Sequence, residues 1–216
     1  MRVGTKLQKS VLTRQRILAA AERRFAEAGF DETRIEDIAN DAGIATSAVL
    51  YHFGDKRALH RAVLSDVTVS LYDSLHRAIA GPADLPTRIE ATVEALVDYV
   101  SRRPTAASLA VRQIVATDPE QRTQVGAYAT RFLDTLRVAF EEGERAGVIQ
   151  PIHPDPLHFV SAIAGAVLFY VAALPAFMPE LPYPHLAPEQ LAALKRDAIA
   201  IAQRLLGSEA RHTHEH

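Results

Sequence analysis

Cysteine is absent from the 216-residue chain, which excludes a disulfide framework and any metal site with thiolate ligands. This absence agrees with a reducing compartment, and the first residues, MRVGTKLQKS, lack the apolar stretch of a secretory signal. We therefore expect a cytoplasmic protein. Aromatic residues make up only 6% of the chain while Ala and Leu are abundant, a balance that favours packed helices.

Strand patterns and catalytic motifs are missing as well. No segment alternates apolar and polar residues at a period of two for long enough to predict a strand, whereas helical spacing recurs along the chain. We predict an all-α fold of about nine helices. The chain has no Gly-rich phosphate loop, no His-Glu-x-x-His and no Gly-x-Ser-x-Gly. We therefore expect no enzyme, no catalytic residue, no metal site and no cofactor.

The net charge of −2 is unevenly distributed. Residues 1–60 hold 10 Lys/Arg and 8 Asp/Glu, a net of +2, while the remainder holds 14 and 18, a net of −4. Five cations come before the first acidic residue: Arg2, Lys6, Lys9, Arg14 and Arg16. A basic start suits a polyanion, because Lys and Arg displace counterions from phosphates. A solvated, disordered start explains the same charges equally well.

The clearest local pattern is a pair of short helices joined by a glycine. Thr33 and Glu36 have the spacing of a capping box, Gly43 ends the first short helix, and a second begins near Thr46 or Ser47. A longer helix at 13–28 precedes them. Such a pair meets the requirement for reading the major groove, which admits one protruding, rigidly held helix. We predict a basic arm over 1–12 and a helix-turn-helix domain over 13–60.

The rest of the chain predicts a helical body over 61–207 and a disordered tail over 208–216. We expect six further helices, at 56–80, 87–103, 105–116, 119–147, 156–174 and 188–206. Asp55 is expected to cap the first of these, Thr87 and Glu90 repeat the capping-box spacing, and Asp118 and Asp155 each precede a proline at a helix start.

The stretch TRIEDIANDAGIATSAVLYHFGDKRAL, from Thr33 to Leu59, resembles the DNA-binding signature of the tetracycline-repressor (TetR/AcrR) family. The residues on signature positions are Ile38, Ala39, Ala42, Gly43, His52, Phe53, Lys56 and Leu59. The first helix also fits the family pattern through Phe25 and Gly29-Phe30. The remainder of the chain resembles the family only in being all-helical.

Three positions depart from the signature. Ala45 replaces a frequent Ser, so we expect Thr46 or Ser47 to cap the recognition helix. Ser47-Ala48 replaces a Gly-Thr pair. Leu50 replaces a Tyr that often touches a phosphate, and Tyr51, next along, is expected to supply that contact unless Arg34 or Lys56 does.

The DNA contacts that we predict follow from this docking mode. The residues expected at base edges are Thr46, Ser47, Ala48 and Tyr51, with the Ala48 methyl group facing thymine. Those expected at phosphates are Arg34, His52 and Lys56, and Leu50 belongs to the same predicted DNA-binding set. The competing interpretation is that Tyr51 and His52 are half-buried packing residues.

The resemblance implies a ligand-responsive repressor that binds a palindromic operator on double-stranded DNA as a homodimer, although activation is the alternative outcome. It also implies that helices 156–174 and 188–206 pair across the dimer. A small hydrophobic effector is expected in the body, releasing the DNA by shifting the long helix at 56–80. The candidate ligand-binding residues are Tyr128, Phe132, Phe169, Tyr170 and Arg112.

Three other features of the sequence allow different interpretations. Residues 159–178 carry no charge and are long enough to span a bilayer, but Pro175 lies inside the run and no basic cluster follows, so we expect no membrane. The tail histidines His212, His214 and His216 have no supporting fold for a metal. A helical enzyme or carrier, and an architectural DNA-binding protein without a ligand, are the competing classes of function.

Overall fold

A computed structural model describes residues 3–115, 119–180 and 183–208, and every regular element in these ranges is helical. The elements are α1 (Val3–Glu32), α2 (Ile35–Ala42), α3 (Thr46–Phe53), α4 (Lys56–Ile79), α5 (Leu85–Arg102), α6 (Pro104–Val115), α7 (Pro119–Arg145), α8 (Pro156–Leu168), the π-helical η1 (Phe169–Ala173), α9 (Leu174–Phe177) and α10 (Pro188–Leu206). Because α8, η1 and α9 follow one another without a break, the described ranges contain nine helical runs. The all-α prediction is confirmed.

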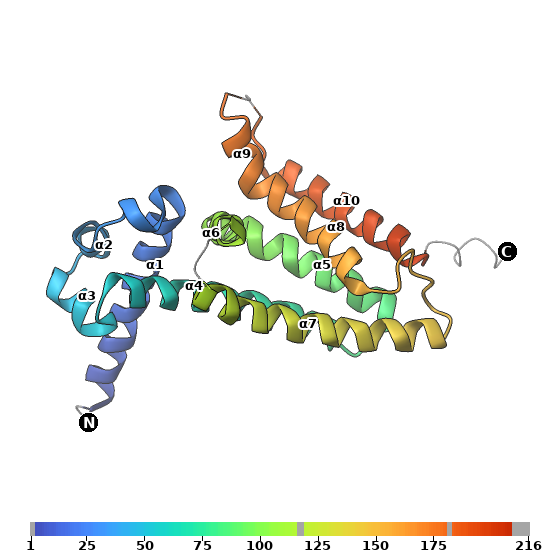
Figure 1. Ribbon diagram of the computed structural model, residues 1–216, viewed down its shortest axis with the longest axis horizontal. Helices are drawn as coiled ribbons and strands as arrows, with labels where there is room; N and C mark the ends of the chain where they lie inside the picture. Colours follow the sequence, from blue (N-terminus) through green and yellow to red (C-terminus); the bar gives the residue numbers. More distant parts are fainter. Residues whose placement is uncertain (1–2, 116–118, 181–182, 209–216) are drawn as a thin grey trace.

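The molecule has two parts, which we call the head and the body. The head consists of α1–α3 and the first turns of α4, and the body consists of the rest of α4 with α5–α10. Figure 1 shows the head at one end of an elongated bundle, with α4 running from one part into the other.

Each part has its own hydrophobic core. The largest fully buried side chains of the head are Ile17, Phe25, Ile38, Val49, Leu59 and Val63. Those of the body are Ile89, Val97, Val100, Leu136, Phe140 and Val167. The helix α4 contributes Val67 to the first core and Leu75 and Ile79 to the second. The helix α4 is therefore packed in both cores and connects the head to the body.

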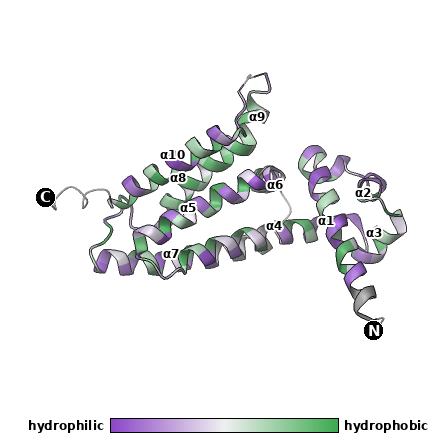
Figure 2. Ribbon diagram, turned by 180° about the vertical axis from the view of Figure 1, so that it is seen from behind, coloured by the Kyte–Doolittle hydropathy of each residue, from purple (hydrophilic) through white to green (hydrophobic). Residues whose placement is uncertain are grey.

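The run from α8 into η1 leaves one apolar face uncovered. The segment Pro156–Ala173 is long and apolar enough to cross a membrane, with a mean hydropathy of 1.8, yet only 28% of its residues are buried. Phe159, Ile163 and Val167 pack on the body core. The exposed residues recur at helical spacing on another face: Leu157, His158, Ser161, Ala162, Gly165, Ala166 and Phe169. In Figure 2 much of α8 and α9 has the green colour of hydrophobic residues.

The first helix is longer than expected. It begins at Val3, so residues 3–12 are helical and continue α1 where a separate basic arm was predicted. The predicted stop is present as a kink, since Gly29 has φ 84° and ψ 178°. Residues 1–2 and 209–216, and with them most of the predicted tail, lie outside the described residues.

Both predicted capping boxes are wrong. The hydroxyl of Thr33 donates to the carbonyl of Gly29 at 2.6 Å, which ties it to α1 and leaves Arg34 as the N-cap of α2 without a side-chain cap. The helix α5 begins before Thr87, because the Asp84 carboxylate accepts from the backbone N–H of Thr87 at 2.9 Å.

Two other predicted caps are confirmed. Asp55 accepts from the backbone N–H of Ala58 at the start of α4, and Asp155 accepts from that of Leu157 at the start of α8. Asp118 lies outside the described residues.

Candidate DNA-reading surface and effector cavity

The turn between α2 and α3 depends on Gly43. Its backbone is left-handed, with φ 62° and ψ 44°, a conformation that costs other residues free energy. The N–H of Gly43 donates to the carbonyl of Asn40, and that of Ile44 to the carbonyl of Ala39, both at 3.0 Å. This pair of bonds is a Schellman motif, which ends α2 and sends the chain sharply into α3.

Side chains of α1 hold the pair of short helices in place. The guanidinium of Arg24 makes two hydrogen bonds to the Asp41 carboxylate, at 2.6 and 2.7 Å. Arg16 donates to the carbonyl of Ala42, at the last turn of α2. With Ile38 and Val49 buried, the orientation of α3 is set by both packing and hydrogen bonds.

The helix α3 presents one face to solvent, as the docking mode requires. Tyr51 is 87% exposed and Leu50 is 43% exposed, whereas Val49 is 1% exposed. The interpretation of Tyr51 as a half-buried packing residue is therefore wrong. Among the other predicted contact residues, Ser47 is exposed, and three are half-buried: Thr46, Ala48 and His52.

The expected cap of α3 is not formed. The N-cap is Ala45, in an extended conformation and without a side-chain hydrogen bond, while Thr46 already belongs to the helix. The prediction that Thr46 or Ser47 caps this helix is wrong, because the Schellman turn places Ala45, two residues after Gly43, at the position that a capping side chain would occupy.

The side chains predicted to contact phosphates differ in whether they already have partners within the protein. Arg34 is exposed beside the start of α2. The Lys56 amine donates to the carbonyl of Asp31 at 3.0 Å and lies 4.6 Å from the centre of the Phe30 ring, so it also clamps the end of α1. An ammonium has three donors, which leaves two for another acceptor.

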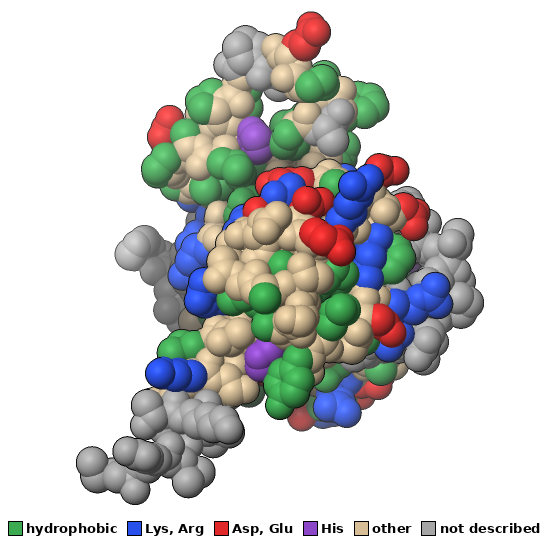
Figure 3. Space-filling view, turned by 90° about the vertical axis from the view of Figure 1, so that its left-hand side faces the viewer, with side chains coloured by type: hydrophobic (Ala, Val, Ile, Leu, Met, Phe, Trp, Pro, Cys, Tyr) green, Lys and Arg blue, Asp and Glu red, His purple; other side chains and the backbone are tan. Residues whose placement is uncertain are grey.

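Sequence reasoning assigned no contact to Arg14, an exposed cation of α1. Its guanidinium lies 4.8 Å from the centre of the Phe53 ring, at the C-terminal end of α3. The predicted helix at 13–28 could have revealed this position, since it already places Arg14 on the same element as Arg16 and Arg24. Figure 3, a view onto the head, shows Lys and Arg side chains on both sides of a largely uncharged central strip.

Comparison with known proteins agrees with this geometry. Residues 17–63 match the family described as bacterial regulatory proteins, tetR family. The transcriptional regulator RutR of Escherichia coli is 28% identical over 162 residues, which cover 74% of each chain. The transcriptional repressor NicS of Pseudomonas putida is 30% identical over 151 residues, covering 70% of this chain and 66% of NicS.

The chain belongs to the tetR family. It is a DNA-binding transcriptional regulator, and its relatives are regulators and not enzymes. The fold also resembles that of FadR from Bacillus subtilis, solved in complex with stearoyl-CoA, with a TM-score of 0.68 at 18% identity over 87% of this chain and 96% of that one.

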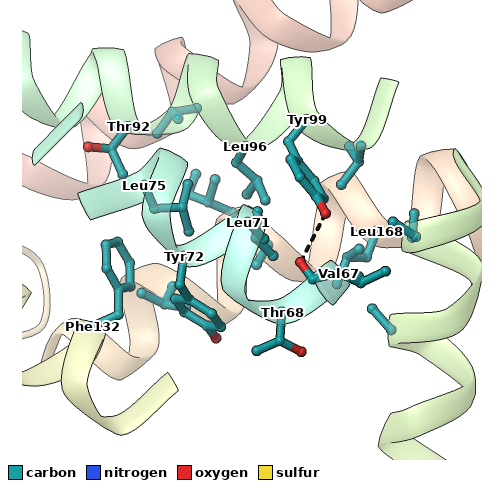
Figure 4. Close-up of a pocket in the computed structure, with 18 of the residues that line it drawn as sticks. Val67, Thr68, Leu71, Tyr72, Leu75, Thr92, Leu96, Tyr99, Phe132 and Leu168 are labelled. Atoms are coloured by element: carbon teal, nitrogen blue, oxygen red, sulfur yellow. Dashed lines mark hydrogen bonds between the residues drawn. The ribbon is translucent and has the colours of Figure 1, made fainter. Parts of the chain in front are cut away.

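The body of this TetR-family regulator contains a cavity of about 410 Å³, which lies in the range of small-molecule sites. Its wall is built by α4, α5, α6, α7 and α8. The residues labelled in Figure 4 are Val67, Thr68, Leu71, Tyr72, Leu75, Thr92, Leu96, Tyr99, Phe132 and Leu168. None of the described residues that line it is charged. The arrangement can enclose an apolar molecule.

One of the five predicted ligand-binding residues, Phe132, lines the cavity. Tyr128 lies behind the wall, with its ring stacked on that of Tyr72 at 6.3 Å between centres. Phe169 is 52% exposed, on the uncovered face that continues from α8. The hydroxyl of Tyr170 donates to that of Tyr183, outside the cavity.

Arg112 has a different role from the one predicted. Its guanidinium donates to the carbonyls of Ala26 and Glu27, each at 3.1 Å, just before the kink at Gly29. A cation at the C-terminal end of a helix satisfies free carbonyls and the helix dipole. Arg112 therefore joins α6 of the body to α1 of the head and lies away from the cavity.

A second link between body and head is centred on Arg103, which follows α5. Its Nε lies 2.9 Å from both carboxylate oxygens of Glu22, a residue of α1 that is 5% exposed. The same guanidinium donates to Asp66 of α4 at 2.7 Å. Burial opposes the charge on Arg103, but these carboxylates outweigh burial and raise the pKa of the guanidinium.

The cavity wall touches this link through Tyr99. Its hydroxyl donates to the carbonyl of Val67 at 2.9 Å, and the bond is drawn in Figure 4. It also lies 3.3 Å from Arg103 and 2.7 Å from the hydroxyl of Ser70. Sequence reasoning missed Glu22, Tyr99 and Arg103, because they lie far apart in the chain and belong to no local motif.

Proposed function

We propose that this regulator is a repressor that binds a palindromic operator as a homodimer and releases it when a small apolar effector occupies the body. The observation that carries the proposal is the exposed face of α3, with Tyr51 at 87% exposure on a helix whose other side is fixed in a core. A protruding helix on rigid support is what enters the major groove. We place the protein in the cytoplasm.

The contacts divide between bases and phosphates. Thr46, Ser47, Ala48 and Tyr51 face base edges from the solvent side of α3, and Leu50, 43% exposed, lies beside them. Side chains at the margins then meet the phosphates: Arg34, Lys56, His52 and Arg14, whose guanidinium lies beside the Phe53 ring at the end of α3.

The uncovered face of α8 supports the homodimer. Small and apolar side chains there, among them Ser161, Ala162 and Gly165, allow another helix to approach closely. An exposed apolar stripe of this length is costly to leave in water. Pairing α8 and α10 of two copies covers it and gives two reading heads, which a palindrome with half-sites one helical turn apart requires.

The coupling between cavity and head runs through α4 and Arg103. A ligand can shift a conformational equilibrium only if it binds the two states with different affinity. Tyr99 lines the cavity and also holds α4 at Val67, so an occupant that moves its ring changes the support of α4 and the partner set of Arg103. The Glu22–Arg103 link carries the change to α1.

Fluorescence anisotropy on labelled duplex from the region upstream of the gene tests DNA binding. We expect the affinity to fall steeply with salt, because cations at phosphates release counterions. Lys56→Ala should weaken binding on all sequences and reduce the salt slope by about one. Arg102→Ala, which removes a body cation whose side chain is 75% exposed, is the matched control and should change neither. Identical salt slopes for Lys56→Ala and wild type would remove Lys56 from the phosphate contacts.

A further inference from the structure

The chemistry of the cavity wall is unusually restricted. Five of the residues that line it have polar side chains: Thr68, Tyr72, Thr92, Tyr99 and Gln113. Every other described lining residue is apolar or glycine, and none is a Lys, Arg, His, Asp or Glu. A charged group transferred into such a site loses its hydration without gaining a partner.

The guanidinium that contacts the wall at Tyr99 does not relieve this penalty. Arg103 lies behind Tyr99 and already pairs with the two carboxylates of Glu22 and Asp66. Two acids around one cation leave a surplus of negative charge on that side. An anionic ligand therefore finds no unpaired cation beside Tyr99, and a cationic one would find no acid among the described lining residues.

The polar groups on the wall differ in whether they are free. Tyr99 is engaged with Val67 and Ser70, and the hydroxyl of Thr92 donates to the carbonyl of Arg88 at 2.7 Å. By contrast, the side-chain Nε2 of Gln113 is buried and has no hydrogen-bond partner in the described part of the chain. An unmade hydrogen bond to a buried donor is costly, so a ligand oxygen that accepts it gains affinity.

From these observations we propose that the effector is an uncharged, mainly apolar molecule with a carbonyl, ether or hydroxyl oxygen that accepts a hydrogen bond from Gln113. Carboxylates and phosphate-bearing thioesters are excluded from this class. Thr68 and Tyr72, one helical turn apart on α4, offer hydroxyl groups to a second polar atom. Burial raises the pKa of Tyr72, which keeps its hydroxyl neutral and able to donate. This proposal rests on the proposed function, since it assumes that the cavity is the effector site.

A matched set of probes that share a ten-carbon chain tests the class: decanol, methyl decanoate, decanoate and decane. Thermal shift and calorimetry of the full chain at about pH 8 measure binding without DNA. We expect decanol and the ester to raise Tm and to bind at least tenfold more tightly than decanoate. Equal affinities for decanol and decanoate would overturn the neutral class.

Two substitutions locate the binding. Gln113→Leu should weaken decanol about five- to tenfold and leave decane unchanged, because only the hydrogen bond is lost. Gln15→Leu, on the exposed side of α1, is the control and should alter neither. Leu71→Phe should fill the cavity and weaken both probes, with circular dichroism checking that the variant is folded. Decanol binding that survives both cavity substitutions would place the probe elsewhere and overturn the proposal.

The outcome is separable from that of the proposed function. If decanoate and decanol bound with equal affinity while duplex binding stayed salt-dependent, only the proposed effector class would be overturned. Probes behaving as expected on a protein that ignores every duplex would support the cavity chemistry and overturn the DNA-binding role.

Discussion

Arg103 and Glu22 form an ion pair that joins the two parts of the molecule. The guanidinium follows α5 in the body, and it makes hydrogen bonds to both oxygens of a carboxylate on α1 of the head. A bidentate pair of this kind fixes orientation as well as distance. Because Glu22 is 5% exposed, removal of Arg103 would leave a buried carboxylate without its ion-pair partner.

Removing Arg103 should therefore destabilise the protein and abolish the coupling between the cavity and the head. We expect Arg103→Met to lower the free energy of unfolding by about 2–3 kcal/mol, less than for a fully buried pair because the Arg103 side chain is 29% exposed. In the same variant decanol should still bind but should no longer release duplex. Urea unfolding and anisotropy measure the two effects. Arg102→Met, one residue away and 75% exposed, is the control and should stay within about 0.5 kcal/mol of wild type.

Tyr51 should matter for DNA and not for folding. Its 87% exposed ring contributes little to the core, so Tyr51→Ala should change Tm by no more than a degree or so. Its affinity for duplex should fall about tenfold or more, in line with the loss of one good base contact. Tyr183→Ala, an exposed tyrosine of the body, should leave duplex affinity unchanged. Equal affinity of Tyr51→Ala and wild type would show that Tyr51 does not touch DNA.

Gly43 should tolerate no side chain. With φ at 62° and an added Cβ only 3.0 Å from the Arg16 guanidinium, Gly43→Ala should cost about 1 kcal/mol or more in unfolding free energy. Gly126→Ala should have the opposite effect and raise the unfolding free energy by about 0.5–1 kcal/mol. Gly126 lies inside α7, and an added Cβ there meets open space. Denaturant unfolding measures both changes in free energy. The prediction would be contradicted if the two variants changed the unfolding free energy in the same direction.

The Arg24–Asp41 pair should make part of the stability of the head depend on pH. The hydrogen bond from Arg24 holds the pKa of Asp41 below its ordinary value. The pair therefore stabilises the fold above the ordinary aspartate pKa of about 4, and this contribution is lost as the pH falls through the lower folded value. The difference in Tm between wild type and Asp41→Asn should shrink as the pH is lowered from about 7 to 3. An unchanged difference over that range would contradict the pair's role.

What could be predicted from the sequence was local. The positions of Gly43, Asp55 and Asp155 predicted helix ends correctly, because a helix ends or begins through contacts with its immediate neighbours. The exposed face of α3 followed from the same short-range pattern. By contrast, Thr33 matched a capping box but lies against α1, where a nearer pair of carbonyls competes for its hydroxyl.

The cavity could not be predicted in the same way. Its wall takes residues from five helices, and helical periodicity cannot say which apolar residues face a void and which face one another. Arg112 was singled out because it is a cation in an apolar stretch, yet its partners are carbonyls more than eighty residues away. The charge of the first residues predicts a basic arm, because charge alone does not distinguish a helix from a disordered chain. In the structure these residues form the beginning of α1.

The distance between the two α3 helices of the dimer tests the account most directly. The chain has no cysteine, so Ser47→Cys carries a single spin label on the exposed face of each α3. We predict that pulsed electron spin resonance finds label separations near one helical turn of DNA, about 34 Å, in the free dimer. Saturating decanol should shift the distribution of label separations in the protein that carries only Ser47→Cys. The same addition should leave the distribution unchanged in the protein that also carries Arg103→Met. A distribution that decanol does not move, or a protein that stays monomeric, would contradict the account.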